Sequence, residues 1–412
     1  MSSLRAPFRH PMFRRYFAGQ AISQVGDFVF FVALPWQVLV LTGSAADLGG
    51  VYSTYFAAQL ILLLAGGVLT DRVSRRTLVV LSDVLQGILV GAVALLAGTG
   101  SLSVGHLYLF GALFGAAQAF AMPALSAFLP ETVPKADLQA ANSLYQGTRT
   151  LALIGGPALG ALLIAVGGTT AAFAFDAVSF AVSATLLWSA RGGAGAPRAR
   201  ERKPPVIVQV REGWRYVARV PWLWITILVF AIVNAAEAGP RGVVLPAFVG
   251  LDLGGGYAAI GLVLSTMAAG SLLGFFLPNF LPSIRHRGLV AYIATAVFGV
   301  SIALMAFSPN LTGILALGFF HGVAVAVFSL MWQTAMMEQV REDIRGRVFS
   351  LDELGSFVLL PFSFFACGVL AVLYGPRVVL LGGGLIVMLC AAAGLLYPPA
   401  HTFEGPAPRA SG

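Results

Sequence analysis

Two charged residues deep inside long apolar runs, Asp27 and Arg149, are the first candidates for chemistry in this sequence. A charge among apolar side chains is costly unless it is paired, so each needs a partner or a task. Both lie about 12 residues into their runs, and this equal depth allows them to pair. Gln24 extends the face of Asp27, and Gln146 extends the face of Arg149. We hypothesise that Asp27 binds and releases a proton with Arg149 as its counter-charge; the alternative is a static pair that only orders the helices.

A second polar stripe has Asn234, Glu237 and Arg241 at positions i, i+3 and i+7, which lie on one face of a helix. Glu237 and Arg241 can neutralise each other across one helical turn. If the stripe instead faces a cavity, Glu237 is a second candidate for holding a proton or a cationic group. His321 can titrate near neutral pH, although a lone histidine in a helix is more typical of a hydrogen-bonded packing residue.

The elements that carry these residues are long and apolar. Of the 412 residues, 58% are hydrophobic and 10% are charged, whereas about a quarter of a soluble domain is charged. This composition excludes a soluble globular enzyme and makes lipid the solvent, in which a crossing helix needs about 20 mostly apolar residues. The sequence predicts twelve crossings, at residues 16–41, 48–70, 77–98, 105–129, 138–166, 169–190, 222–248, 257–281, 288–308, 311–337, 347–374 and 376–397.

The basic residues mark one side of the membrane. With the N-terminus in the cytoplasm, 22 of the 25 lysines and arginines fall in cytoplasmic segments, as the positive-inside rule requires. We therefore expect both termini in the cytoplasm. The net charge of +8 comes from short clusters between apolar runs, which argues against nucleic-acid binding. The first run contains Asp27 and Trp36 and exceeds the apolar core of a signal peptide, so we expect it to remain as a helix.

One long connection, residues 191–221, divides the chain. Its glycines, prolines and basic residues predict a hinge followed by an amphipathic helix that anionic lipid attracts to the inner surface; a plain linker is the alternative. The predicted organisation is an N-terminal six-helix bundle at 1–190, this linker at 191–221, a C-terminal six-helix bundle at 222–400 and a cytoplasmic tail at 401–412.

A weak internal repeat relates the two halves. An offset of 207 residues places Gly67 on Gly274 and Asp27 on Asn234. The expected fold class is therefore an all-α polytopic membrane protein, with twelve transmembrane helices in two pseudo-symmetric six-helix bundles. Duplicated halves with a site near mid-membrane suit a transporter that alternates access to the two sides.

The loop after the second predicted span carries the strongest motif, Gly-Val-Leu-Thr-Asp-Arg-Val-Ser-Arg-Arg. Its characteristic positions are Gly67, Asp71, Arg72, Arg75 and Arg76. The segment resembles the signature loop of the major facilitator superfamily, with a serine where the family usually has its second glycine. The alternative is that these arginines only fix the topology.

The resemblance implies a cytoplasmic gate. Asp71 would lie against the positive N-terminal end of the eleventh span and hold the halves together. Asp352 and Glu353, early in that span, would pair with Arg72, Arg75 or Arg76 in the closed state.

The fifth predicted span has a small-residue pattern made by Gly147, Gly156, Pro157 and Gly160. Small residues let another helix approach closely, and proline bends the span. The pattern resembles a motif of the antiporter branch of the superfamily and so favours export; a packing face without that meaning is the alternative. Stretches such as Gly43-Ser44-Ala45 resemble a group that includes macrolide efflux proteins and the enterobactin exporter. The arginine that many proton-coupled exporters carry in the fourth span is absent.

Taken together, the resemblance implies a secondary exporter of small amphiphilic molecules of the drug, antibiotic or siderophore type, working by alternating access in exchange for protons. We expect a monomer in the bacterial cytoplasmic (inner) membrane, with lipid, cargo and protons as partners and with no cofactor or metal. A solute importer of the same fold is the nearest alternative. A polytopic membrane enzyme is a more distant one, because five scattered histidines without a His-Glu-x-x-His pattern offer no metal site.

Overall fold

Helices make up nearly all of the described part of the chain. The computed structural model describes residues 4–190, 206–277, 286–342, 344–398 and 403, and within these ranges the side chains outside 64–72 and 206–210; no strand occurs among them. Contacts divide the chain into two units. The first comprises Met1–Arg202 with Val249–Ser265, and the second comprises Lys203–Phe248 with Thr266–Gly412.

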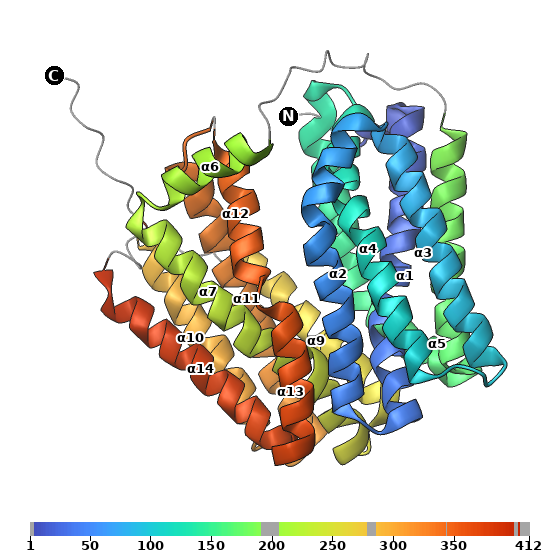
Figure 1. Ribbon diagram of the computed structural model, residues 1–412, viewed down its shortest axis with the longest axis vertical. Helices are drawn as coiled ribbons and strands as arrows, with labels where there is room; N and C mark the ends of the chain where they lie inside the picture. Colours follow the sequence, from blue (N-terminus) through green and yellow to red (C-terminus); the bar gives the residue numbers. More distant parts are fainter. Residues whose placement is uncertain (1–3, 191–205, 278–285, 343, 399–402, 404–412) are drawn as a thin grey trace. The chain divides into compact units, whose positions relative to one another are not determined.

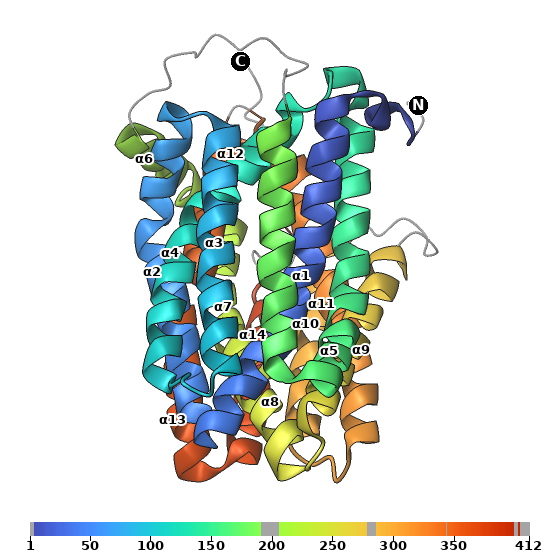
Figure 2. The same cartoon turned by 90° about the vertical axis from the view of Figure 1, so that its right-hand side faces the viewer.

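The first unit is built from five long helices that run side by side (Figure 1). They are α1 (Pro11–Thr42), α2 (Ala45–Arg72), α3 (Arg75–Gly98), α4 (Val104–Phe128) and α5 (Leu138–Ser189), with short 3-10 turns at η1 (Ala6–Arg9), η2 (Leu129–Glu131) and η3 (Lys135–Asp137). The 52-residue α5 is two helices, because Gly167 and Gly168 leave the helical conformation and Gly168 has a φ of +68° that favours glycine. Figure 2 shows the chain reversing at this break, where the sequence predicts the boundary between its fifth and sixth spans.

The second unit contains most of the remaining helices. They are α6 (Val206–Val217), α7 (Pro221–Gly239), η4 (Pro240–Val244), α8 (Leu245–Ala247), α10 (Arg287–Met305), α11 (Leu311–Gln339), α12 (Arg345–Phe357), α13 (Leu360–Tyr374) and α14 (Pro376–Leu396). Two further elements, η5 (Phe248–Asp252) and α9 (Gly256–Phe276), include residues 249–265, which cluster with the first unit although the sequence assigns them to the second half. The tight contact of Gly261 with Pro157 and Ala161 accounts for this placement.

Most of the helices are long and apolar enough to cross a membrane. Ten helical stretches of the described residues are long and apolar enough to cross a bilayer. One of them, Lys135–Ser189, contains the two arms of α5, and α2 is a further 28-residue helix. The twelve-helix fold class predicted from the sequence is therefore confirmed.

Two predicted spans differ in detail from the structure. The seventh continues to Asp252, because the chain passes the prolines at 240 and 246 through two π-helical turns, η4 and η5, instead of ending there. The eleventh is divided into α12 and α13 at Val358 and Leu359, just before Pro361, which cannot donate a backbone hydrogen bond.

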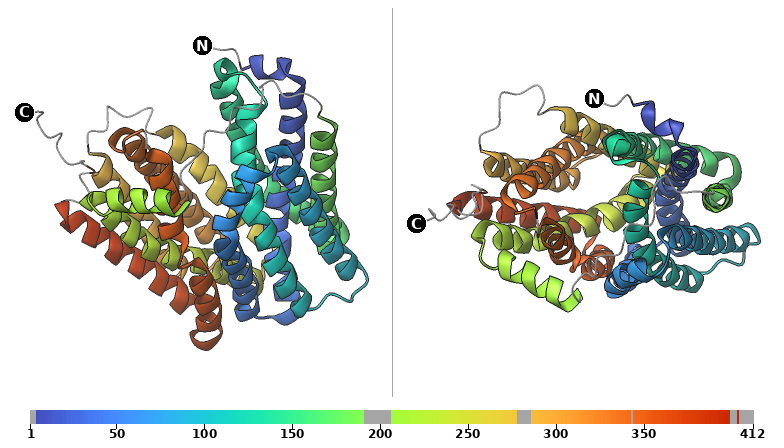
Figure 3. Two further views of the ribbon diagram at one scale, coloured as in Figure 1. Left: turned by 45° about the horizontal axis from the view of Figure 1, so that its top comes forward. Right: turned by 90° about the horizontal axis from the view of Figure 1, so that it is seen from above.

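The predicted linker is partly described. The helix expected within it is present as α6, which lies across the end of α12 and is seen side-on from above (Figures 1 and 3). Arg211, Trp214 and Arg215 are exposed on it. An ion pair between Glu212 and Arg347 connects α6 to α12. The predicted hinge lies outside the described residues, as does the predicted tail except for Phe403.

An exposed apolar stripe on α3 marks a surface that faces lipid. Leu81, Ile88 and Leu95, each two turns apart, are 58%, 63% and 73% exposed. The opposite side of α3 is buried and contributes Leu78 and Val79 to the core of the first unit. A helix that contacts lipid on one side and protein on the other is expected to be apolar on both sides, as α3 is.

Glycines on α4 allow close approach of α2. A Cβ at Gly115 would overlap the backbone of Tyr55, and one at Gly111 would lie 2.8 Å from the carbonyl oxygen of Val51. We expect Gly115→Ala to destabilise the protein by about 1–3 kcal/mol, because α2 must move. The measurement is thermal unfolding of the purified protein in detergent. Gly155→Ala is the control, since a Cβ there meets nothing within 4 Å; a Gly115→Ala protein that melts at or above the wild-type temperature would contradict the close packing.

Candidate functional site

A cavity of about 620 Å³ lies within the first unit, among α1, α2, α4 and α5. One face of α1 supplies Gln20, Gln24 and Asp27 to its lining. The first arm of α5 supplies Gln146 and Arg149. The charged and amide residues that the sequence places at equal depth in two separate spans therefore line one cavity.

Aromatic side chains form the apolar wall of this cavity. The rings of Phe30 and Phe114 are stacked with centroids 5.7 Å apart, and Phe110 lies 5.1 Å from Phe114. Tyr55 from α2 adjoins them, with its ring centroid 6.1 Å from that of Phe114. Apolar and aromatic walls with a few polar groups are typical of small-molecule sites. The sequence does not reveal this cluster, because the four rings come from three helices.

Asp27 and Arg149 share the cavity without touching. Among the described residues no ion pair within 4.0 Å joins them. Asp27 is partly buried and Arg149 is exposed. The two opposite charges therefore both face the cavity space, where a bound molecule or a proton can alter their interaction. The hypothesis that Asp27 is a protonation site stays a prediction.

A hydrogen-bonded chain lies behind α1, between α1, α3 and the second arm of α5. Gln20 donates to the hydroxyl of Ser183 at 3.3 Å, and that hydroxyl donates to Asp83 at 2.6 Å. All three residues are buried. The network gives Asp83 a local partner outside the cavity and secures α1 against the rest of the unit.

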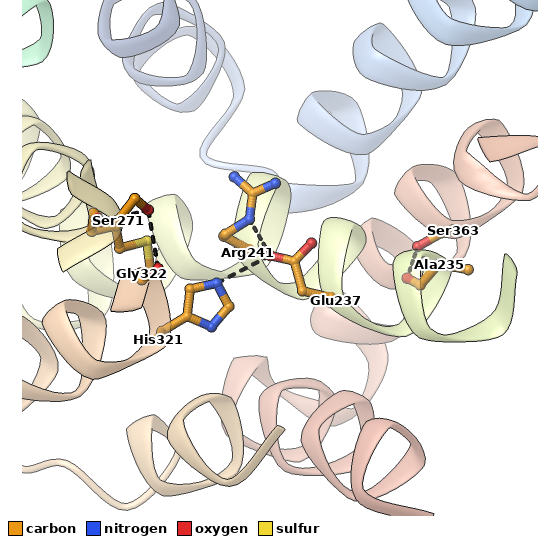
Figure 4. A network of polar contacts seen from close by, with 8 residues as sticks. Ala235, Glu237, Arg241, Ser271, His321, Gly322 and Ser363 are labelled. Carbon is orange, nitrogen blue, oxygen red and sulfur yellow. Dashed lines mark hydrogen bonds and ion pairs between the residues drawn. The ribbon is translucent and has the colours of Figure 1, made fainter. Parts of the chain in front are cut away.

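In the second unit, Glu237 is bound by two residues (Figure 4). Arg241 donates to its carboxylate across one turn, so the i, i+4 pairing that the sequence allows is present. From α11, Nε2 of His321 lies 3.3 Å from Oε1 of Glu237. His321 is 3% exposed, and its ring lies edge-on to Phe298 at 5.7 Å. The sequence marks His321 as titratable but does not connect it to Glu237, because 84 positions of chain separate them.

A proline-induced turn positions this group. Pro240 lacks a backbone donor, and the chain continues through the π turn η4, which carries Arg241. The hydroxyl of Ser363 donates to the carbonyl of Ala235, just before the interruption (Figure 4). Such side-chain bonds compensate for backbone interruptions inside membranes. Asn234, predicted to share the stripe, donates instead to the carbonyl of Ser356 on α12 at 3.1 Å.

The predicted gate residues are only partly described. Gly67, Asp71 and Arg72 belong to α2, but their side chains lie outside the described residues. Arg75 donates to Glu131 at 2.9 Å, and Arg76 donates to carbonyls at the end of α5, including Leu187 at 2.9 Å.

The hydrogen bonds of Arg75 and Arg76 hold the start of α3 against other elements of the first unit.

The two predicted acidic gate residues lie on α12. Asp352 accepts a hydrogen bond from the indole of Trp332 at 2.9 Å, and the neighbouring Glu353 is exposed. The predicted pairing of these two acids with the arginines stays a prediction.

The small-residue pattern of α5 packs against α1. A Cβ at Gly156 would overlap Phe28, and one at Gly160 would lie 3.0 Å from the carbonyl oxygen of Val29. Pro157 sits between them and contacts Gly261. A Cβ at Gly147 would meet no other atom within 4 Å. Close helix packing is thus evident at Gly156 and Gly160.

Comparison with known proteins identifies the family. The chain matches the Major Facilitator Superfamily over residues 16–351 and 238–412, and it belongs to that family. It is 27% identical to the multidrug efflux pump Tap of Mycolicibacterium fortuitum over 383 residues, which cover 90% of this chain and 92% of the relative. It is 26% identical to the enterobactin exporter EntS of Salmonella typhi over 343 residues, covering 83% and 81%. A crystal structure of a mutant nucleoside transporter, NupG, has the same fold, with a TM-score of 0.74 at 12% identity and coverage of 93% and 98%.

The chain is therefore a membrane transporter and not an enzyme, and the resemblance predicted from its motifs is confirmed. Its apolar helices make it a multi-pass protein, and its bacterial relatives support a place in the inner membrane.

Proposed function

We propose that the protein is a secondary exporter of small amphiphilic molecules, which it moves by alternating access in exchange for protons. The observation that carries this proposal is the cavity of the first unit, where an aromatic wall faces Asp27, Arg149 and a set of amides. Aromatic rings suit the apolar part of a cargo, and the few polar groups orient it. The similarity to Tap and EntS supports export of drug-like or siderophore-like compounds.

Asp27 is the proposed coupling site. Its carboxylate can exchange one proton with the cavity, and Arg149 supplies the opposing charge in the same space. Protonation removes the negative charge of Asp27, while the positive charge of Arg149 remains. A proton and a charged cargo group therefore affect each other's binding through the same pair of charges. Carboxylates inside membrane spans are typical elements of proton relays.

The remaining features are proposed to serve the conformational cycle. Asp71, with Arg72, would close the cytoplasmic side, and the packing of Gly156 and Gly160 against α1 would keep that interface tight enough to move as one body. The basic clusters favour a cytoplasmic position for both termini. The protein would act as a monomer.

An accumulation assay tests this function. Efflux-deficient cells that express the protein are loaded with a panel of antibiotics, dyes and siderophores, with and without an uncoupler. We expect lower accumulation of at least one amphiphilic compound, and we expect the uncoupler to abolish the difference. Vector-only cells are the control. Higher accumulation in expressing cells would instead favour an importer, and no change for any compound would count against transport of this cargo class.

A further inference from the structure

Gln24 has an amide that is not used within the protein. Neither its Nε2 nor its Oε1 has a hydrogen-bond partner in the part of the chain that the structure describes, and the residue is only 7% exposed. An amide buried without partners costs its full desolvation energy. Gln24 also lines the cavity of the first unit. Both amide atoms are unpaired and almost fully covered beside that cavity, so a turn of the side chain presents them to a molecule that enters it.

The other buried glutamines of the described residues differ from Gln24 in this respect. Gln20 donates to Ser183, Gln86 donates to Gln118, and Gln37 accepts from the hydroxyl of Thr169. Each of these amides joins two helices. Gln24 makes no such connection, so its polarity contributes nothing to packing within the unit.

We propose that Gln24 pairs with an amide-type group of the cargo, such as a carboxamide or a lactam, which presents an N–H donor and a carbonyl acceptor side by side. The rest of this cargo is an aromatic or alicyclic skeleton that packs against the wall formed by Phe30, Phe114 and Tyr55. The inference rests on the proposed export function and specifies the chemical class of the cargo.

The polar groups that line the cavity favour a cargo with an amide-type group over a simple ion. A glutamine amide offers one acceptor and two donors without net charge, and a second amide complements it with two hydrogen bonds. A cationic group would be directed to Asp27 and an anionic group to Arg149. A site with committed hydrogen-bonding groups rejects analogues that lack the matching group, because its own polar atoms then stay unpaired. Gln24 would therefore select amphiphilic molecules that carry an amide-type group over those that lack one.

A matched pair of fluorescent probes tests the proposal. Anthracene carboxamide and acetylanthracene have nearly the same size, and the second replaces the amide nitrogen with a methyl group. We expect the purified full-length protein to bind the carboxamide about tenfold more tightly than the ketone. Gln24→Met should lower the affinity for the carboxamide about tenfold and so remove this preference. Gln24→Leu, which removes both the donors and the acceptor, should remove it as well.

Gln37→Met is the control, because Gln37 is on the same helix, is 8% exposed and does not line the cavity. It should keep the preference for the carboxamide. Thermal unfolding separates the roles further. Gln24→Met should melt no lower than the wild type, since it removes an unpaired buried amide, whereas Gln37→Met should melt lower because Thr169 loses its acceptor.

Three results would overturn the inference: no preference in the wild type, a preference that survives Gln24→Met, or a Gln24→Met protein that fails to fold. Export of other compounds by the wild type in the accumulation assay would, in any of these cases, leave the proposed function standing. Absence of export for every compound, together with absence of probe binding, would count against both.

Discussion

Asp27→Asn is expected to reduce proton-coupled export at least about tenfold, because asparagine keeps the size of aspartate but cannot gain or lose a proton at this position. The side chain lines the same cavity as Arg149 and forms no ion pair with it within 4.0 Å. Removing the charge therefore changes the electrostatics of the cavity without removing a packing group. The measurement is export into proteoliposomes under an imposed pH gradient, with proton flux followed in the same vesicles.

Asp83→Asn is the matched control for this prediction. Asp83 is another aspartate of the same unit; it is buried, accepts from Ser183 and does not line the cavity. An asparagine can still accept that hydrogen bond through its amide oxygen. We expect this variant to retain gradient-driven export. Unchanged, gradient-dependent export by Asp27→Asn would remove Asp27 from the coupling mechanism.

The positions of the spans could be predicted from the sequence because lipid imposes a simple condition. Every backbone group in the bilayer must be paired within the chain, so long apolar runs become helices. The pair Gly167-Gly168 divides α5 where the apolar pattern places a boundary. The π turns that extend α7 are different in kind, because they depend on how Pro240 is accommodated by neighbours such as Ser363. Hydropathy carries no signal for such tertiary compensation.

At the candidate sites, too, the sequence identifies the residues but not their tertiary contacts. The sequence identifies Asp27 and Arg149 as costly charges, and their common cavity follows from equal depth. It cannot distinguish Gln20, which is bonded to Ser183, from Gln24, which is unpaired, because both lie on the same face of α1. Which amide is satisfied depends on α5, more than 150 positions away in the chain. The contact of His321 with Glu237 cannot be read from the sequence for the same reason.

The contact between His321 and Glu237 leads to the second prediction of large effect. The side chain of Glu237 is 13% exposed and interacts with both Arg241 and His321. Removing one member of a buried charged group takes a compensating charge away from the others, which typically costs about 3–5 kcal/mol. Because the Arg241 side chain is 38% exposed, water offsets part of this loss. We expect Glu237→Gln to destabilise the protein by about 2 kcal/mol and to impair export while membrane insertion stays normal.

A double-mutant cycle isolates the bond to His321. If the 3.3 Å contact between Nε2 and Oε1 is made in the folded protein, His321→Gln should destabilise the wild type more than it destabilises Glu237→Gln. The difference should be about 0.5–3 kcal/mol, as for residues in one hydrogen-bonded network. Unfolding of the purified protein in detergent provides the free energies, and transport by the same variants shows whether the group also serves the cycle.

Thr226→Val provides the control cycle. Thr226 bonds to Tyr292 on α10 and lies about 16 Å along α7 from Glu237 at the rise of a helix. Its effect should add to that of Glu237→Gln within about 0.5 kcal/mol, since distant sites behave independently. Additive effects in the His321 cycle as well would mean that the imidazole only packs beside Glu237. Coupled stability with wild-type export in Glu237→Gln would instead make this group a structural anchor of the π turn and leave Asp27 as the proposed carrier of the proton.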